Sequence, residues 1–212
     1  MGLKPPSMVP LTLAVATDAL LKKEFDIVRK TGESHPLWEK HGLKVRAYQH
    51  PDIDNWRSNF KGLRFTHPST GMVIYGAVDD IWIDQNTSKL HIVDYKSTSK
   101  HGDPSIDNGG WGDAYKRQME IYQWIFRKSG FDVSDLGYFL YVNGRKDHDF
   151  YNDKLDGIMH FDTTLIPYEG NTDWVESKVI EAVECLKEDV IPTGVEDCDN
   201  CRYFYQRAAL EP

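Results

Sequence analysis

Asp94 and Lys96 are the residues whose types and spacing most directly suggest chemistry. They flank Tyr95 at the end of an apolar run, and a strand would direct both side chains to one face. Asp79 and Asp80 end an earlier apolar run, and Asp79 would lie opposite Asp94 if the two runs pair as a hairpin. Converging carboxylates repel each other unless a cation bridges them, and hard oxygen ligands select Mg²⁺ or Mn²⁺. The pattern predicts a metal site whose lysine orients or deprotonates a water, whereas a lone Asp-x-Lys pair more simply marks a solvated strand face.

Two strands and a helix must position these side chains. Residues of β-branched and aromatic type predict a strand over 72–84 and a second strand over 90–95. The polar segment Gln85–Ser88 between them is typical of a turn, so the two strands are expected to form a hairpin. Apolar residues at helical spacing then predict a helix over 113–128, with Asp113 as its capping residue.

The rest of the chain supplies further helices and strands. A helix is expected over 11–30, short helices and turns over 33–62, a strand over 137–142, a strand over 158–162 and a helix from Thr172. This order predicts a single mixed α/β (α+β) domain over residues 1–212. We expect a C-terminal α/β extension from about residue 145 and a Cys-containing tail over 185–205.

Composition narrows the classes of protein further. The 212 residues carry 25 Lys and Arg against 33 Asp and Glu, a net charge of −8 that by itself argues against a nucleic-acid partner. No apolar stretch is long enough to span a membrane, and no secretory signal precedes the first helix. The odd number of cysteines, three, favours a reducing, cytoplasmic location over a secreted disulfide scaffold.

Three segments together resemble the PD-(D/E)XK nuclease superfamily, over roughly residues 12–143: Gly76-Ala77-Val78-Asp79, Ile92-Val93-Asp94-Tyr95-Lys96-Ser97 and Gln118-Met119-Glu120-Ile121-Tyr122. The likeness is closer to the RecB-like branch, which includes CRISPR-associated adaptation nucleases and the nuclease domains of bacterial recombination helicases. It implies a restriction-endonuclease-like core, in which helices flank a central mixed β-sheet.

The resemblance also implies a role for each matching residue. Asp79 matches the metal-binding acid of the G-x-x-D motif, and Asp94 matches the acid of the D/E-x-K motif. Lys96 matches the catalytic lysine, and the backbone carbonyl of Tyr95 would be a further metal ligand.

Gln118 and Tyr122 match the Q-x-x-x-Y motif of the RecB-like branch, which lies beside the site and contacts the nucleic acid or the lysine. Periodicity alone would also allow Tyr122 to be a core residue. For Gln118, on an apolar-flanked helix face, the functional role is favoured.

A fourth metal ligand is harder to assign. Relatives carry a His or Glu in the first helical region, often after a Gly, and His35 in Gly32-Glu33-Ser34-His35 is the best match. His35 follows the break of the first helix and precedes a proline, so a plain surface residue is the alternative. Asp18, Glu24, Asp26 and Asp80 are further candidates, although a helix cap or a solvated face would explain the first three.

The cysteines suggest a second metal site. Cys198-x-x-Cys201, with Cys185 upstream, resembles the C-terminal half of the iron–sulfur site that some RecB-like nucleases carry. The chain has no N-terminal cysteine, so it cannot form a four-cysteine cluster alone. Zinc held by these thiolates and a His is one alternative, and free thiols in a C-terminal turn are the other.

These observations predict a Mg²⁺- or Mn²⁺-dependent nuclease that hydrolyses phosphodiester bonds, with single- or double-stranded DNA as the expected substrate. The alternative is a catalytically degenerate member of the fold that acts as a nucleic-acid-binding or assembly module. The motifs also change what the net charge implies about nucleic-acid binding. Non-specific DNA affinity should be weak and salt-sensitive, and a protein partner would help to deliver substrate. The oligomeric state and the membership of a pathway are left open.

Overall fold

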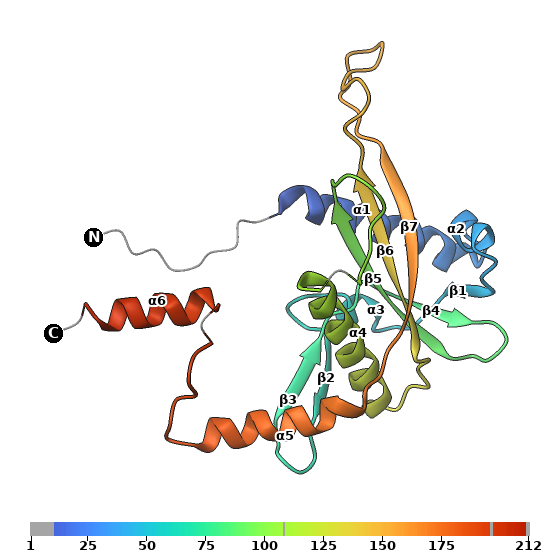
Figure 1. Ribbon diagram of the computed structural model, residues 1–212. Helices are drawn as coiled ribbons and strands as arrows, with labels where there is room; N and C mark the ends of the chain where they lie inside the picture. The colour runs from blue at the N-terminus through green and yellow to red at the C-terminus, as the bar shows by residue number, and fades with distance from the viewer. Residues whose placement is uncertain (1–10, 108, 196, 211–212) are drawn as a thin grey trace.

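The computed structural model describes residues 11–107, 109–195 and 197–210, and it is built around one mixed β-sheet (Figure 1). The sheet has the strand order β1-β4-β5-β6-β7, in which β5 and β6 are parallel and all other neighbours are antiparallel. A separate two-stranded sheet pairs β2 with β3. The elements are α1 (Thr12–Thr31), α2 (Pro36–Lys40), β1 (Val45–Ala47), α3 (Ile53–Trp56), β2 (Leu63–Thr66), β3 (Val73–Gly76), β4 (Asp80–Asp84), β5 (Leu90–Thr98), α4 (Trp111–Lys128), β6 (Leu136–Gly144), β7 (Phe161–Glu169), α5 (Asp173–Lys187) and α6 (Asp199–Ala208).

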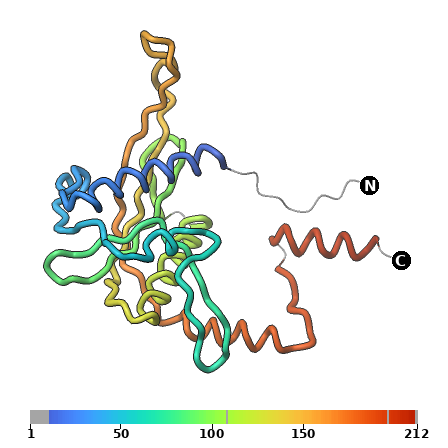
Figure 2. The backbone as a smooth tube through the Cα atoms, turned by 180° about the vertical axis from the view of Figure 1, so that it is seen from behind, coloured from blue at the N-terminus to red at the C-terminus, as the bar shows by residue number. Residues whose placement is uncertain are grey.

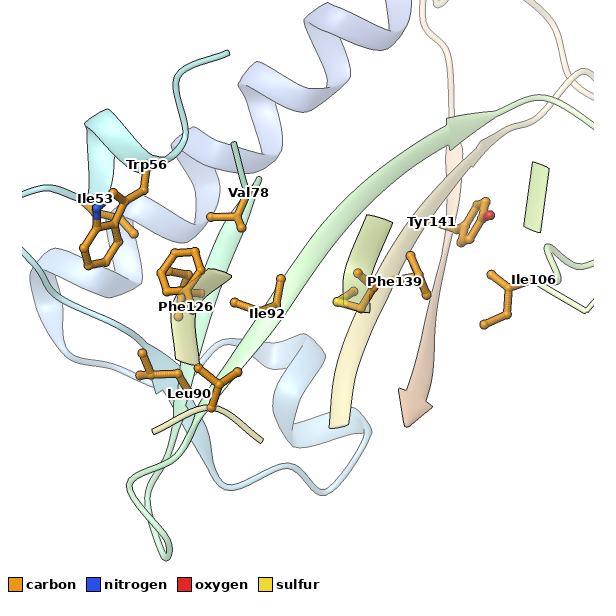
Figure 3. Packing of buried hydrophobic residues seen from close by; sticks show 12 residues of the cluster. Ile53, Trp56, Val78, Leu90, Ile92, Ile106, Phe126, Phe139 and Tyr141 are labelled. Carbon is orange, nitrogen blue, oxygen red and sulfur yellow. The ribbon is translucent and has the colours of Figure 1, made fainter. Parts of the chain in front are cut away.

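Helices flank both faces of the central sheet, which confirms the predicted mixed α/β fold (Figures 1 and 2). On β5, Ile92 points into the core shared with α4, and Figure 3 shows it near Phe126 and Phe139. The next residue, Val93, points into the core shared with Phe25 of α1. This alternation places Asp94 and Lys96 on the α4 side of the strand, as the period of two requires.

Both flanking helices have clear physical end signals. Gly32 adopts a left-handed conformation directly after α1, and its backbone N–H closes the last turn. Helix α4 begins at Trp111 and its N-cap residue is Gly110, so the prediction that Asp113 caps it is wrong by three residues. Asp113 lies instead in the first turn, where a carboxylate interacts favourably with the positive end of the helix dipole.

The strand predicted over 72–84 is divided in two. Its first half is β3, which pairs with β2 rather than with the central sheet, and its second half is β4. The hairpin of β4 and β5 is confirmed, because Asp80 pairs with Val93 and Ile83 with Leu90 around the predicted turn. Asp79 therefore lies in the short link between the two sheets.

The strand predicted over 158–162 is placed too early. Strand β7 starts at Phe161 and continues to Glu169 along the edge of the sheet. Its sequence contains Pro167, and proline is tolerated at an edge where the missing N–H needs no partner. Only one side of β7 is buried, so its other side carries polar residues. These polar residues interrupt the apolar pattern from which a strand is predicted.

Beyond the central sheet, α5 packs on α4, and α6 lies apart from the sheet with no buried residue in it (Figure 2). None of the helices within the described residues is long and apolar enough to cross a membrane. The division into one domain with a C-terminal extension stays a prediction.

Candidate active site

Asp79 and Asp94 meet where the link after β3 enters the central sheet. An Oδ2 atom of Asp79 accepts a hydrogen bond of 2.7 Å from the backbone N–H of Tyr95, which fixes the carboxylate against β5. Asp94 is buried, whereas 24% of the Asp79 side chain is exposed. Burial and the negative charge of Asp94 raise the pKa of Asp79 to about 7, and burial also raises the pKa of Asp94. The site therefore concentrates more negative charge than its surroundings neutralise.

Lys96 lies beside Asp94 and is held from three sides. Its ammonium group forms an ion pair with Asp94 and donates a hydrogen bond of 3.3 Å to Oε1 of Gln118. The same Nζ lies 4.3 Å from the centre of the Tyr115 ring. Gln118 in turn donates a hydrogen bond of 2.9 Å to the Tyr122 hydroxyl. The structure thus joins Asp94, Lys96, Gln118 and Tyr122 in one connected set.

Close packing of β3 on α4 keeps Tyr122 in this set. Gly76 ends β3, and a Cβ atom added there would lie 2.5 Å from Cε1 of the Tyr122 ring. Only glycine allows the strand to approach the ring so closely. Burial raises the pKa of the Tyr122 hydroxyl, so it remains a neutral hydrogen-bonding group.

Helix α1 contributes Asp18 and Lys22 to the same place. Nζ of Lys22 lies 2.9 Å from Oδ2 of Asp18 and 3.5 Å from Oδ1 of Asp79. A hydrogen bond between the hydroxyl groups of Thr17 and Ser97 attaches this turn of the helix to β5. Sequence reasoning missed Lys22. The i, i+4 spacing of Asp18 and Lys22 could have revealed the pair, but not its approach to Asp79.

The structure does not bring His35, Glu24 or Asp26 to these carboxylates. His35 caps α2, where its Nδ1 accepts a hydrogen bond of 3.0 Å from the backbone N–H of Leu37, and its Nε2 lies 3.4 Å from Glu24. Asp26 accepts hydrogen bonds from the Arg57 guanidinium group. Of the first-helix candidates for the fourth ligand, only Asp18 adjoins the site.

Asp80 has a structural role, although it directly follows Asp79 in the sequence. It is fully buried and forms an ion pair with Arg29 of α1. Its Oδ2 accepts a hydrogen bond of 3.0 Å from the Tyr95 hydroxyl, and its Oδ1 accepts one of 2.8 Å from the N–H of Ile81. These contacts account for its buried charge and leave it on the α1 side of the sheet.

The three cysteines are free thiols and remain apart from the carboxylates. Cys185 is exposed on α5, whereas Cys198 caps α6 and accepts a hydrogen bond from the N–H of Cys201. Backbone N–H groups at this helix start lower the pKa of Cys198. Within the described residues, no group of three His, Cys, Asp or Glu side chains is arranged to hold a metal ion. The thiolate site therefore has no geometric support.

The donor set around Asp79 nevertheless fits a hard divalent cation. Asp79 and Asp94 supply carboxylate oxygens, and Tyr95, whose backbone carbonyl is a further candidate ligand, directly follows Asp94. Asp94 Oδ2 is buried, and it faces the Lys96 ammonium as an ion pair without a hydrogen bond of good geometry. Mg²⁺ commonly uses one or two carboxylates and completes its shell with water and substrate oxygens, so a cluster of three side chains is not required.

Comparison with protein families identifies one to which the chain is similar. The profile of the PD-(D/E)XK nuclease superfamily matches residues 10–204, which is most of the chain. Neither the curated proteins nor the solved structures give a significant match. The family match covers Asp79, the hairpin that carries Asp94 and Lys96, and the helix that carries Gln118. With its five-stranded mixed sheet flanked by helices, the chain belongs to the PD-(D/E)XK nuclease superfamily.

Proposed function

We propose that this protein is a metal-dependent nuclease that hydrolyses phosphodiester bonds in DNA. The observation that carries the proposal is the position of Lys96 between Asp94, whose charge also acts on Asp79, and Gln118. Membership of a superfamily of nucleases supports a phosphodiester substrate. Asp79, Asp94 and the Tyr95 carbonyl would hold Mg²⁺ or Mn²⁺, with Asp18 directly or through a water.

The chain's own groups then have distinct tasks. A bound divalent cation supplies an acidified water and offsets the charge of the phosphate. Lys96 directs its ammonium group at the attacking water and stabilises negative charge that develops on the phosphate oxygens. Gln118 and the Tyr115 ring keep the Lys96 side chain extended toward the carboxylates. Lys22 neutralises part of the charge on Asp79 and Asp18.

We also propose that the protein falls in the RecB-like branch. The hydrogen bonds that connect Tyr122, Gln118 and Lys96 support this, because they are the contacts expected of the Q-x-x-x-Y motif. Unpaired thiols at all three cysteines suit the reducing cytoplasm that we propose as its location.

The test is cleavage of single- and double-stranded DNA in the presence of Mn²⁺ by the Lys96→Ala variant. We expect its rate to fall by about 100-fold or more, because a positioned charged group in the transition state is worth that much. Lys89→Ala is the matched control, since Lys89 is exposed and directly precedes β5, at the end of the strand opposite to Lys96. Unchanged cleavage by Lys96→Ala would refute the mechanism.

A catalytically degenerate member is the competing interpretation, and metal binding separates the two. Calorimetric titration with Mn²⁺ should show saturable binding that Asp79→Asn and Asp94→Asn each abolish. A protein that binds DNA but shows no saturable Mn²⁺ binding would be an assembly or binding module instead.

A further inference from the structure

The two-stranded sheet of β2 and β3 has an outer face that the catalytic proposal does not use. Its buried side packs on α4 through Phe65 and Ile74. Its outer side carries Arg64 and Tyr75, which are directly paired across the two strands. Phe60 stands just before β2, and 92% of it is exposed. Phe60 and Tyr75 therefore present two exposed rings on one face, and exposed aromatic rings are the groups on which single-stranded nucleic acids stack their bases.

Arg64 is held in a defined position on this face. Its guanidinium carbon lies 5.1 Å from the centre of the Tyr75 ring. Its Nε donates a hydrogen bond of 3.1 Å to the carbonyl of Lys61, and its Nη2 donates one of 3.4 Å to the carbonyl of Phe60. A guanidinium plane fixed in this way, with an open aromatic ring beside it, offers both charge and a flat stacking surface.

The charge of this face is opposite to that of the protein as a whole. Among the described residues, neither Arg64 nor Lys61 has a carboxylate within ion-pair distance, and Lys61 donates instead to the side-chain amide of Asn55. In a chain of net charge −8, two cations without acidic partners form a local site for an anion. The combination of free positive charge and exposed rings is complementary to a nucleic-acid strand.

This face is continuous with the candidate active site. Tyr75 directly precedes Gly76, which contacts the Tyr122 ring, and Asp79 follows three residues later. Tyr75 and Asp79 are four residues apart, and four residues of extended chain span at most about 14 Å. The distance from Tyr75 to the carboxylates is therefore no more than the length of a few nucleotides. Figure 1 shows the arrow of β3 pointing toward the N-terminal half of α4, which carries Gln118. A strand bound at Asp79 can therefore reach Phe60, Arg64 and Tyr75.

We propose that Phe60, Arg64 and Tyr75 form a subsite for single-stranded nucleic acid that flanks the scissile phosphate. The inference rests on the proposed nuclease function and specifies that the active site takes a single-stranded substrate. One base stacks on the Phe60 ring or on the Arg64 guanidinium plane, and Lys61 and Arg64 contact phosphates. A duplex is disfavoured at this subsite because its base faces are already covered by neighbouring bases.

The test measures binding rather than cleavage. A fluorescein-labelled oligodeoxynucleotide, single-stranded or annealed to its complement, is titrated with the Lys96→Ala protein in EDTA and followed by fluorescence anisotropy. Adding Phe60→Ala should weaken single-strand binding by about 5-fold or more, the loss typical of one stacked base, with little effect on the duplex. Arg64→Ala should weaken it as well and lower the slope of log K against log salt by about 0.7. Phe150→Ala is the control, because Phe150 is a 62% exposed ring on the link between β6 and β7.

The outcomes separate the two proposals. The subsite is refuted if Phe60→Ala leaves single-strand binding unchanged, or weakens it no more than Phe150→Ala does. This holds even if the protein with Lys96 intact cleaves DNA. Equal losses for single strand and duplex overturn the preference for single strands. Single-strand binding that depends on Phe60 and Arg64, in a protein that cleaves no DNA, upholds the subsite and refutes the nuclease proposal.

Discussion

Asp79 and Asp80 are neighbours of the same type, yet their asparagine variants should change stability in opposite directions. Asp79 is crowded by Asp94, and its pKa is raised from 3.8 to about 7. Burial raises the pKa of Asp80 as well, but its neighbour is the Arg29 guanidinium group rather than a second carboxylate, and it holds three favourable contacts. In metal-free buffer, Asp79→Asn should therefore stabilise the fold at about pH 8, whereas Asp80→Asn should destabilise it.

The size of the first effect follows from the raised pKa of Asp79. Between pH 3.8 and about 7 the unfolded chain has released the Asp79 proton while the folded chain retains it, so stability falls as the pH rises through that window. Each pKa unit corresponds to 1.36 kcal/mol, so the charge on Asp79 costs the folded state at most about 4 kcal/mol above about pH 7. Asparagine removes this cost, and the gain should vanish near pH 4.

The size of the second effect follows from the contacts of Asp80. Replacing the Asp80 carboxylate with an amide removes the closest counter-charge of the buried Arg29 guanidinium group. Asp26 is then the remaining carboxylate partner of Arg29. Breaking a buried ion pair from one side typically costs about 3 to 5 kcal/mol.

Urea unfolding of the parent protein and both variants in EDTA, at several pH values from about 4 to 8, measures these free energies. Mn²⁺-dependent cleavage per folded molecule is measured alongside. Cleavage should be lost in Asp79→Asn and retained in Asp80→Asn. A destabilised Asp79→Asn at pH 8, or an Asp80→Asn that keeps full stability and loses cleavage, would refute the assignment of the two residues.

Two further predictions concern the surroundings of Lys96. Tyr115→Leu removes the ring 4.3 Å from the Lys96 ammonium and should lower kcat by about 2- to 30-fold with little change in KM, whereas Tyr115→Phe should retain the rate; equal losses in both variants would contradict a role for the ring face. Gly76→Ala forces a methyl group against the Tyr122 ring and should lower the free energy of unfolding by about 1 to 3 kcal/mol in urea titration, together with the cleavage rate; a fully stable, fully active variant would show that the ring is free to move.

The motifs could be recognised in the sequence because their chemistry depends on local spacing. Asp94 and Lys96 are two residues apart on a strand, and Gln118 and Tyr122 are one turn apart on a helix, so each pair shares a face by backbone geometry alone. The hairpin of β4 and β5 followed from the turn between them, which sets the register that brings Asp79 toward Asp94.

Contacts between distant segments could not be predicted in this way. The G-x-x-D motif selects Asp79, but the local pattern does not show the surroundings of Asp80, which ends the same apolar run. Only the approach of Arg29 from α1 pairs Asp80 in the core. The same holds for β3, whose residues resemble a continuation of β4 until Gly76 lets the chain pass close to Tyr122 and join β2.

The sequence by itself determined the resemblance to the superfamily, through three short motifs, and the mixed α/β fold, because residue type and short-range periodicity indicate helices and strands. Local spacing also grouped Asp79, Asp94 and Lys96. The tertiary structure alone decided which first-helix side chains join the group. It placed Asp18 and Lys22 at Asp79 and turned His35 toward Glu24, since the angle at which α1 packs on β5 determines which helical face meets the carboxylates. Packing angles depend on side-chain contacts across the whole interface, and no local spacing records them.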